Sequence, residues 1–150
     1  VAAQLADAWL NDPAHVSAGR ALRDRFEERV VAGARRAGVD ASVNGPLGVD
    51  GHAEPLRLWN TSSIAFARLE AEALLLLLSE RGVCCSAGAA CSSGSLEPSS
   101  VLLATGIPPD TAHGSLRFSL SRETTEQEAD HAAEIVVQGV ARLSRSMPAG

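Results

Sequence analysis

The chain of 150 residues is the size of one domain, and its apolar and charged fractions of 45% and 21% are those of a soluble globular protein. The net charge of −5 argues against nucleic acid as a partner, because binding to phosphate requires a basic face. No apolar run reaches the roughly 20 residues of a membrane span, no secretory leader opens the chain, and three cysteines fit a reducing compartment, so we expect a cytoplasmic protein without a membrane partner.

Helices are predicted for the first part of the chain. Leu5 and Trp9 lie four residues apart among alanines, which indicates a first helix. Asp12 and Pro13 then match an N-cap and the first position of a second helix. That helix has apolar residues at every fourth position: Leu22, Phe26, Val30 and Ala34. Because the chain begins inside a helix without a cap, we expect residues 1–40 to be a helical segment that links to a large domain missing from this sequence.

Residues 41–150 are expected to form a small C-terminal α/β domain. The turn at Asn44-Gly45 and an alternation of apolar and polar residues predict short strands between residues 41 and 66. The alternating apolar residues are Leu56, Leu58, Ile64 and Phe66. Five consecutive leucines predict a helix over Glu70–Arg81 that is buried on most sides. Next to it, Cys84 and Cys85 are interpreted as small core residues of a short strand.

The segment 86–97 consists mainly of serine, alanine and glycine around Cys91. No bulky side chain anchors the part before Leu96, so a mobile loop is predicted. A short helix up to Gly106 is expected after it.

The C-terminal part predicts one strand and one long helix. In Ser115–Leu120, apolar residues alternate with polar ones, which places Arg117 on the face opposite the leucines and the phenylalanine. Thr124 and Gln127 match a capping box for the final helix. The apolar stripe of that helix is Ala129, Ala132, Val136, Val140 and Leu143. The elements together predict an α+β fold, a small mixed or antiparallel sheet packed against helices.

Cys91 is the first candidate for chemistry. It is either an ordinary exposed cysteine of a linker or a thiol on a flexible arm, which can accept a group and deliver it over a distance. The second interpretation has support because free cysteines are normally buried. The spacing of the three cysteines matches no common zinc pattern, and no histidine lies close to them in sequence, so no metal site is expected.

Arg117 is the second candidate. Its face of the strand is either simply solvated, or its guanidinium binds a substrate carboxylate through two hydrogen bonds. His113 lies near this strand in sequence and is interpreted as a surface or turn residue. All 13 basic residues are arginine, so the chain has no lysine that could bind pyridoxal phosphate as a Schiff base.

Three motifs follow one another in the second half of the chain: Ala90-Cys91-Ser92-Ser93-Gly94-Ser95, then Leu96-Glu97-Pro98-Ser99, then Ser115-Leu116-Arg117-Phe118-Ser119. Leu58-Trp59-Asn60-Thr61 and the Asn44-Gly45 turn precede them. In their order and spacing they resemble the C-terminal region of cysteine desulfurases of the NifS/IscS type. These are pyridoxal-phosphate enzymes of the class V aminotransferase group, and the resemblance covers most of the chain.

The resemblance implies the small domain of a fold-type I enzyme, without the large domain that carries the lysine for pyridoxal 5'-phosphate. It implies conversion of L-cysteine to L-alanine, with Cys91 as the nucleophile that takes the sulfur as a persulfide and Arg117 as the residue that holds the substrate carboxylate. It also implies a homodimer, with an iron–sulfur scaffold or another sulfur acceptor as partner. In some members the loop cysteine transiently ligates a [2Fe-2S] cluster.

Two further hypotheses stay open beside a desulfurase fragment that is inactive alone. The first is a stand-alone sulfur-carrier or binding module that accepts persulfide sulfur from a complete enzyme. The second is a remnant without function.

Overall fold

The computed structural model describes residues 1, 3, 4, 6, 7, 12–46, 57–87 and 98–146. In this part, one antiparallel sheet has the strand order β1-β2-β4-β3. Its strands are β1 (Ala41–Val43), β2 (Thr61–Phe66), β3 (Ser86–Ala87) and β4 (Ser115–Ser119). The predicted α+β fold with a small antiparallel sheet is therefore confirmed.

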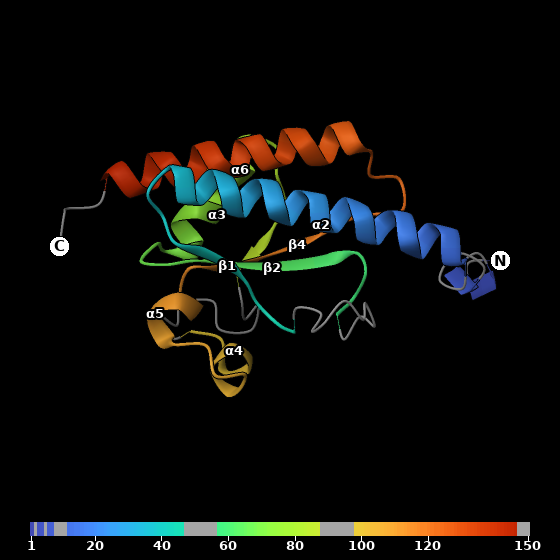
Figure 1. Ribbon diagram of the computed structural model, residues 1–150, viewed down its shortest axis with the longest axis horizontal. Helices are drawn as coiled ribbons and strands as arrows, with labels where there is room; N and C mark the ends of the chain where they lie inside the picture. Colours follow the sequence, from blue (N-terminus) through green and yellow to red (C-terminus); the bar gives the residue numbers. More distant parts are fainter. Residues whose placement is uncertain (2, 5, 8–11, 47–56, 88–97, 147–150) are drawn as a thin grey trace.

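Helices lie on both sides of this sheet (Figure 1). The long helices α2 and α6 run side by side over one face, and α3 packs on the same side. The bounds of these three are Pro13–Arg36 for α2, Ala71–Ser79 for α3 and Glu126–Ser146 for α6. The short helices α4 (Ser100–Ala104) and α5 (Pro109–Ala112) lie on the other side of the sheet.

Helix α2 begins where the sequence predicts. The Asp12 carboxylate accepts a hydrogen bond from the Ala14 backbone N–H at 2.9 Å, and Pro13 is the first helical residue. Three residues of the predicted stripe are buried, namely Phe26, Val30 and Ala34, whereas Leu22 is half-buried. The apolar face of α2 thus packs on the sheet and on α6.

The helix predicted before α2 is described only in part. Residues 3, 4, 6 and 7 are helical, and Leu5 and Trp9 lie outside the described residues. The link of residues 1–40 to a large domain stays a prediction.

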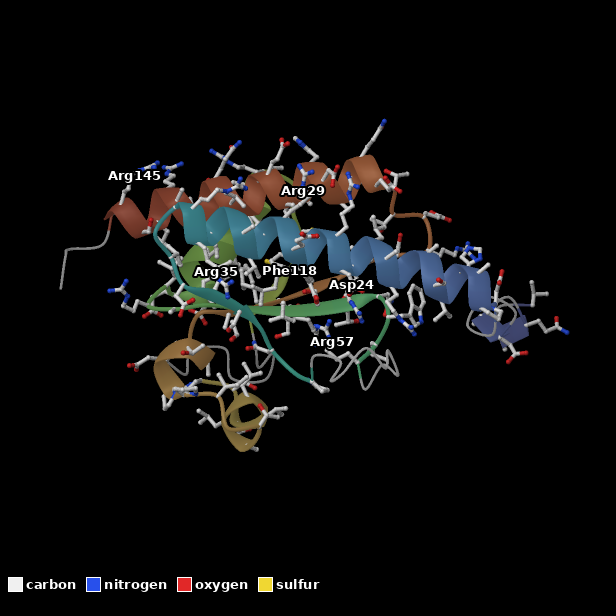
Figure 2. All side chains as sticks on the ribbon, in the orientation of Figure 1. Asp24, Arg29, Arg35, Arg57, Phe118 and Arg145 are labelled. Atoms are coloured by element: carbon white, nitrogen blue, oxygen red, sulfur yellow. The ribbon has the colours of Figure 1, made fainter. Side chains whose placement is uncertain are left out.

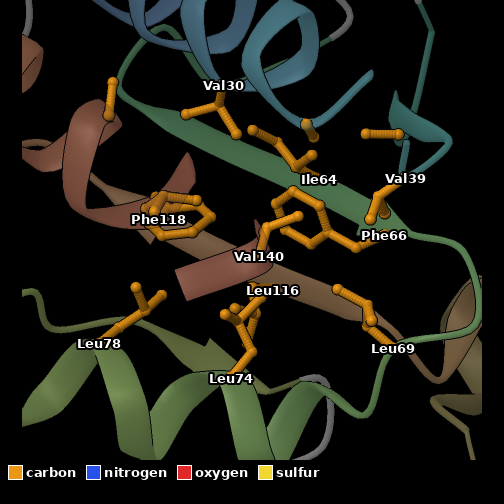
Figure 3. Close-up of a cluster of buried hydrophobic side chains, with 14 of the residues drawn as sticks. Val30, Val39, Ile64, Phe66, Leu69, Leu74, Leu78, Leu116, Phe118 and Val140 are labelled. Atoms are coloured by element: carbon orange, nitrogen blue, oxygen red, sulfur yellow. The ribbon is translucent and has the colours of Figure 1, made fainter. Parts of the chain in front are cut away.

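The hydrophobic core lies between the sheet and the helices α2, α3 and α6 (Figure 3). Strands β2 and β4 contribute alternate residues to it: Ile64, Phe66, Leu116 and Phe118. Val30 of α2, Leu74 of α3 and Val140 of α6 are fully buried against them. Because the core takes every second residue of each strand, the intervening residues, Arg117 among them, project from the opposite face of the sheet.

Helix α3 is less buried than its five leucines predict. Leu74 and Leu78 are fully buried, but Leu76 is 65% exposed. The helix packs on the sheet and on α6 with one face only, so the expectation of burial on most sides was wrong. The expected strand at Leu58 was also wrong, because this residue is 68% exposed and lies before β2. Leu56 lies outside the described residues.

The capping box of α6 lies one residue later than predicted. Glu128 Oε2 accepts hydrogen bonds from the backbone N–H and the hydroxyl of Thr125, both at 2.8 Å, and the Glu128 N–H donates to Thr125 Oγ1. Thr124 is not available for this role because its hydroxyl accepts a hydrogen bond from the Ser121 N–H at 2.9 Å. The box predicted from Thr124 and Gln127 was therefore wrong.

A buried ion pair, which the sequence did not reveal, joins α2 to the segment before β2. Arg57 donates two hydrogen bonds to the Glu27 carboxylate, at 2.8 and 2.9 Å, and both side chains are mostly buried. Asp24 lies 3.9 Å from Arg57, and Figure 2 shows the two close together beside α2. Arg23 also reaches this segment, with a hydrogen bond of 2.7 Å to the Leu58 carbonyl.

Candidate functional site

Arg117 projects from the face of the sheet opposite the core. Its neighbours in β4, Leu116 and Phe118, are buried, whereas Arg117 is exposed, as the alternation of the sequence predicts. A guanidinium nitrogen of Arg117 donates a long hydrogen bond, 3.5 Å, to Ser86 Oγ. Within the described parts of the chain, no carboxylate forms an ion pair with Arg117. Among these residues the charge of Arg117 is therefore unpaired, which favours an anion as its ligand.

Hydroxyl groups surround Arg117 on this face. Across the sheet, Arg117 pairs in register with Ser63 of β2 on one side and Ser86 of β3 on the other. Ser115, two residues earlier in β4, shares the face. A cation next to hydroxyl donors is suited to binding a carboxylate, because that group accepts several hydrogen bonds and carries the opposite charge.

Asn44 connects two of these serines. It follows β1, is 9% exposed, and donates from Nδ2 to Ser63 Oγ at 3.0 Å and to Ser115 Oγ at 3.1 Å. Its backbone N–H donates to the Ser63 carbonyl at 2.8 Å, which extends the pairing of β1 with β2. The side chains of Asn44, Ser63 and Ser115 therefore form a hydrogen-bonded layer beside Arg117, which we call the floor of the site.

Ser86 and Ala87, the first two residues of the predicted loop 86–97, form strand β3 instead, so the loop prediction was wrong for them. Cys91 and the rest of 88–97 lie outside the described residues, so the role of Cys91 and the remainder of the loop stay predictions. The residues at the two ends of this segment are described. On one side Ala87 of β3 pairs with Leu116, next to Arg117, and on the other side Pro98 precedes α4.

Cys84 and Cys85 are not the buried strand residues that the sequence predicts. Cys84 is exposed and Cys85 half-buried, and both precede β3. Strand pairing with β4 begins only at Ser86, so the two cysteines lie in the connection from α3, and neither is paired with a described strand. The expectation that both are protected core residues was therefore wrong.

Cys84 should be alkylated at least about tenfold faster than Cys85 in the folded chain. Burial, and next to it the charge of the neighbouring Cys84, raise the pKa of the Cys85 thiol to about 11, so little reactive thiolate forms at pH 8. Cys84 lines a cavity of about 480 Å³ between the end of α3 and α6, where a reagent has access. Timed labelling with iodoacetamide and peptide mass mapping measures both rates. Equal rates in folded protein, with unfolded protein as reference, would contradict this assignment.

The other expectations for the site concern His113, metals and membranes. His113 ends α5 and is half-buried, which agrees with its interpretation as a turn residue. Among the described residues, no group of three His, Cys, Asp or Glu side chains is placed to hold a metal ion. None of the described helices combines the length and the hydropathy that crossing a membrane demands.

Sequence reasoning identified Arg117 but missed Ser63, Ser86 and Asn44. Serine is frequent throughout this chain, and neither Ser63, which follows Ser62 directly in β2, nor Ser86 carries a pattern that marks it in the sequence. Asn44 looks like an ordinary turn residue in sequence. Its side chain gains its role only through Ser63 and Ser115, which are 19 and 71 residues away.

Comparison with known proteins gives consistent results. The family model for class-V aminotransferases matches residues 48–131. A cysteine desulfurase from Nostoc sp. is 46% identical over 127 residues, which are 85% of this chain and 29% of that protein. The cysteine desulfurase NifS from Azotobacter vinelandii is 46% identical over 138 residues, 89% of this chain and 34% of that protein. The chain thus spans about a third of the length of these relatives.

Solved structures show the same similarity. A NifS-like protein superposes with a TM-score of 0.57 at 25% identity, over 81% of this chain and 28% of that one. A NifS-like protein from Rickettsia africae superposes with a TM-score of 0.53 at 18% identity, over 84% of this chain and 29% of that one, which supports the fold alone.

Proposed function

The chain belongs to the class-V aminotransferase family, and from this premise we propose that it is the C-terminal, small-domain part of a cysteine desulfurase, in which Arg117 binds the substrate carboxylate and Cys91 accepts the sulfur. The family supports the type of reaction. The residue roles rest on the position of Arg117 in the sheet and on the motif around Cys91.

The register of β3 against β4 carries this proposal. Ser86 lies opposite Arg117 and Ala87 lies opposite Leu116, so the chain leaves β3 directly beside the Arg117 guanidinium, which has no carboxylate partner among the described residues. Arg117 lies on β4, which pairs with β3, and Cys91 follows Ala87 of β3 by four residues in the sequence. A small amino acid can then be bound at one end by its carboxylate and meet the thiol at the other.

The proposed reaction is balanced without an external oxidant. The Cβ–S bond of L-cysteine breaks, Cβ receives a proton, and the sulfur atom forms a bond with Sγ of Cys91. The products are L-alanine and a persulfide on Cys91. Arg117 contributes orientation and charge neutralisation through its two parallel N–H groups, which match the geometry of a carboxylate.

Pyridoxal phosphate does not fit the residues of this chain as a covalent cofactor. A Schiff base needs a lysine amine, and all basic residues here are arginine. We therefore derive no step through the cofactor from this chain, and propose that a large domain supplies it. The chain alone is then expected to form no alanine from cysteine.

The partners proposed for the complete enzyme follow from the resemblance to cysteine desulfurases. An iron–sulfur scaffold or another acceptor protein takes the sulfur from Cys91, the enzyme is a homodimer, and the reducing cytoplasm keeps the thiol free. Cys91 is also proposed as a transient ligand of a [2Fe-2S] cluster. The net charge of −5 makes a nucleic-acid partner unsuitable.

A stand-alone sulfur carrier is the second candidate. The absence of lysine, together with a cysteine among small residues, favours it, because a carrier needs a thiol and no cofactor. A carrier would accept sulfur from a complete desulfurase but would not use Arg117.

Sulfur transfer to the 150-residue chain tests the role of Cys91. After incubation with a complete, cysteine-loaded desulfurase, we expect peptide mass mapping to find one extra sulfur atom on Cys91. The variant Cys91→Ser should lose the modification, and the matched variant Cys84→Ser should keep it. Sulfur on Cys84 instead of Cys91 would contradict the assignment.

Arg117 distinguishes the two candidates. In a chimera that joins this chain to the preceding part of the Azotobacter vinelandii enzyme, Arg117→Gln should lower kcat/KM for cysteine by about 100-fold or more, because two charge-assisted hydrogen bonds are lost. Arg122→Gln, which removes only an exposed pair with Glu123, is the control and should change little. An active chimera that tolerates Arg117→Gln would overturn the carboxylate role of Arg117.

A further inference from the structure

Ser115 sets the direction of a chain of hydrogen bonds in the floor of the Arg117 site. Its Oγ lies 3.3 Å from the Thr111 carbonyl oxygen, which can only accept, so the Ser115 hydroxyl donates its proton there. The Ser115 oxygen can then only accept from the Asn44 side chain at 3.1 Å. This defines the orientation of the Asn44 amide, because the atom that faces Ser115 must be Nδ2.

The same nitrogen determines what Ser63 can do. Nδ2 of Asn44 carries two N–H groups, and the second donates to Ser63 Oγ at 3.0 Å. The Ser63 oxygen is thus an acceptor towards Asn44, and its own proton has no acceptor in 12–46, 57–87 or 98–146. Ser63 is half-buried, so this proton remains available to a ligand on the open face of the sheet.

Ser63 lies directly across the sheet from Arg117. Side chains of such a cross-strand pair start about 4.5–5.5 Å apart and point to the same face. A neutral hydroxyl donor therefore stands next to a guanidinium whose charge is not paired with a carboxylate of the described residues. A single carboxylate has four lone-pair positions and can accept from both groups.

We propose that Ser63 is a second ligand of the carboxylate bound by Arg117, and that Asn44 is the positioning residue that keeps the Ser63 hydroxyl a donor. The inference rests on the proposed function, which gives the carboxylate to Arg117 alone. Arg117 supplies charge and Ser63 supplies one hydrogen bond. The hydrogen bonds that link Thr111, Ser115, Asn44 and Ser63 leave the Ser63 hydroxyl as a donor towards the ligand, even before the ligand binds.

Titration of the isotope-labelled 150-residue chain with L-alanine tests the proposal, because this probe has the substrate carboxylate and no thiol. NMR signals of the Arg117 side chain report the Kd. We expect Ser63→Ala to raise the Kd about tenfold, the usual effect of losing one hydrogen bond to a charged group. Ser63→Thr keeps the hydroxyl and should bind like the original chain.

Two further variants separate the possible outcomes. Ser42→Ala removes a hydroxyl from the same face of the sheet, on β1 and away from Arg117, and should leave the Kd unchanged. Arg117→Gln should abolish the titration. If Arg117→Gln abolishes the titration but Ser63→Ala binds with the Kd of the original chain, Ser63 is not a ligand and the proposed role of Arg117 stands. If the original chain shows no titration, or Arg117→Gln does not change it, both proposals are overturned.

Discussion

Replacing Arg57 with methionine is expected to lower the free energy of unfolding by about 3–5 kcal/mol. The Glu27 carboxylate has only 7% of its side-chain surface exposed and accepts two hydrogen bonds from Arg57. Without the guanidinium, a negative charge remains in a site that water hardly reaches. That loss is a large part of the about 5–15 kcal/mol that hold a typical domain together. Urea unfolding, followed by circular dichroism, measures it.

Two control variants show whether burial is the cause. The double variant Arg57→Met with Glu27→Leu removes both charges and should recover most of the stability, because an apolar pair of similar volume often replaces a buried ion pair without cost. Arg25→Met breaks an exposed pair with Asp130 and should cost about 1 kcal/mol or less. A loss for Arg57→Met no larger than that for Arg25→Met would show that the buried pair does not stabilise the fold.

Replacing Gly114 with alanine should destabilise the chain by about 3 kcal/mol, the upper end of the usual cost of overpacking. A Cβ atom at this position would overlap the carbonyl oxygen of Phe66, which is backbone and cannot turn away. The Phe66 N–H also donates to the Gly114 carbonyl at 3.0 Å, so the two backbones are in direct contact. Since Phe66 is fully buried in the core, moving the backbone of Gly114 away from that of Phe66 would disturb the packing around Phe66. Thermal and urea unfolding give the change.

Gly82→Ala is the matched control for this glycine. Gly82 has a φ of +81°, and no atom of the described residues lies within 4 Å of the position that a Cβ would take there. Alanine at this position therefore meets only the backbone strain of the left-handed region, about 1–2 kcal/mol. Gly114→Ala should cost clearly more. If both variants lose the same free energy of unfolding, the contact with Phe66 relaxes easily, and the close approach of the Phe66 and residue-114 backbones does not require glycine.

The sequence alone determined the elements whose apolar residues recur with a regular period. Asp12 and Pro13 located the start of α2, and its stripe through Phe26, Val30 and Ala34 is buried as expected. The alternation around Arg117 correctly placed this residue opposite the core. These predictions succeeded because hydrogen bonding within a helix and the pleat of a strand are local, so a few neighbouring residues define which face is apolar. The motif around Cys91 was equally local and led to the family.

Tertiary structure decided the features that depend on partners distant in sequence. Glu27 appears in the sequence as one charged residue of a helix, and it is buried only because Arg57 reaches it. Cys84 looked like a core residue, but sheet pairing starts two residues later and leaves it exposed. The sheet order brings Asn44, Ser63 and Ser115 together. Periodicity describes which side of an element is apolar, whereas long-range packing decides what lies against that side, and the second cannot be derived from the first.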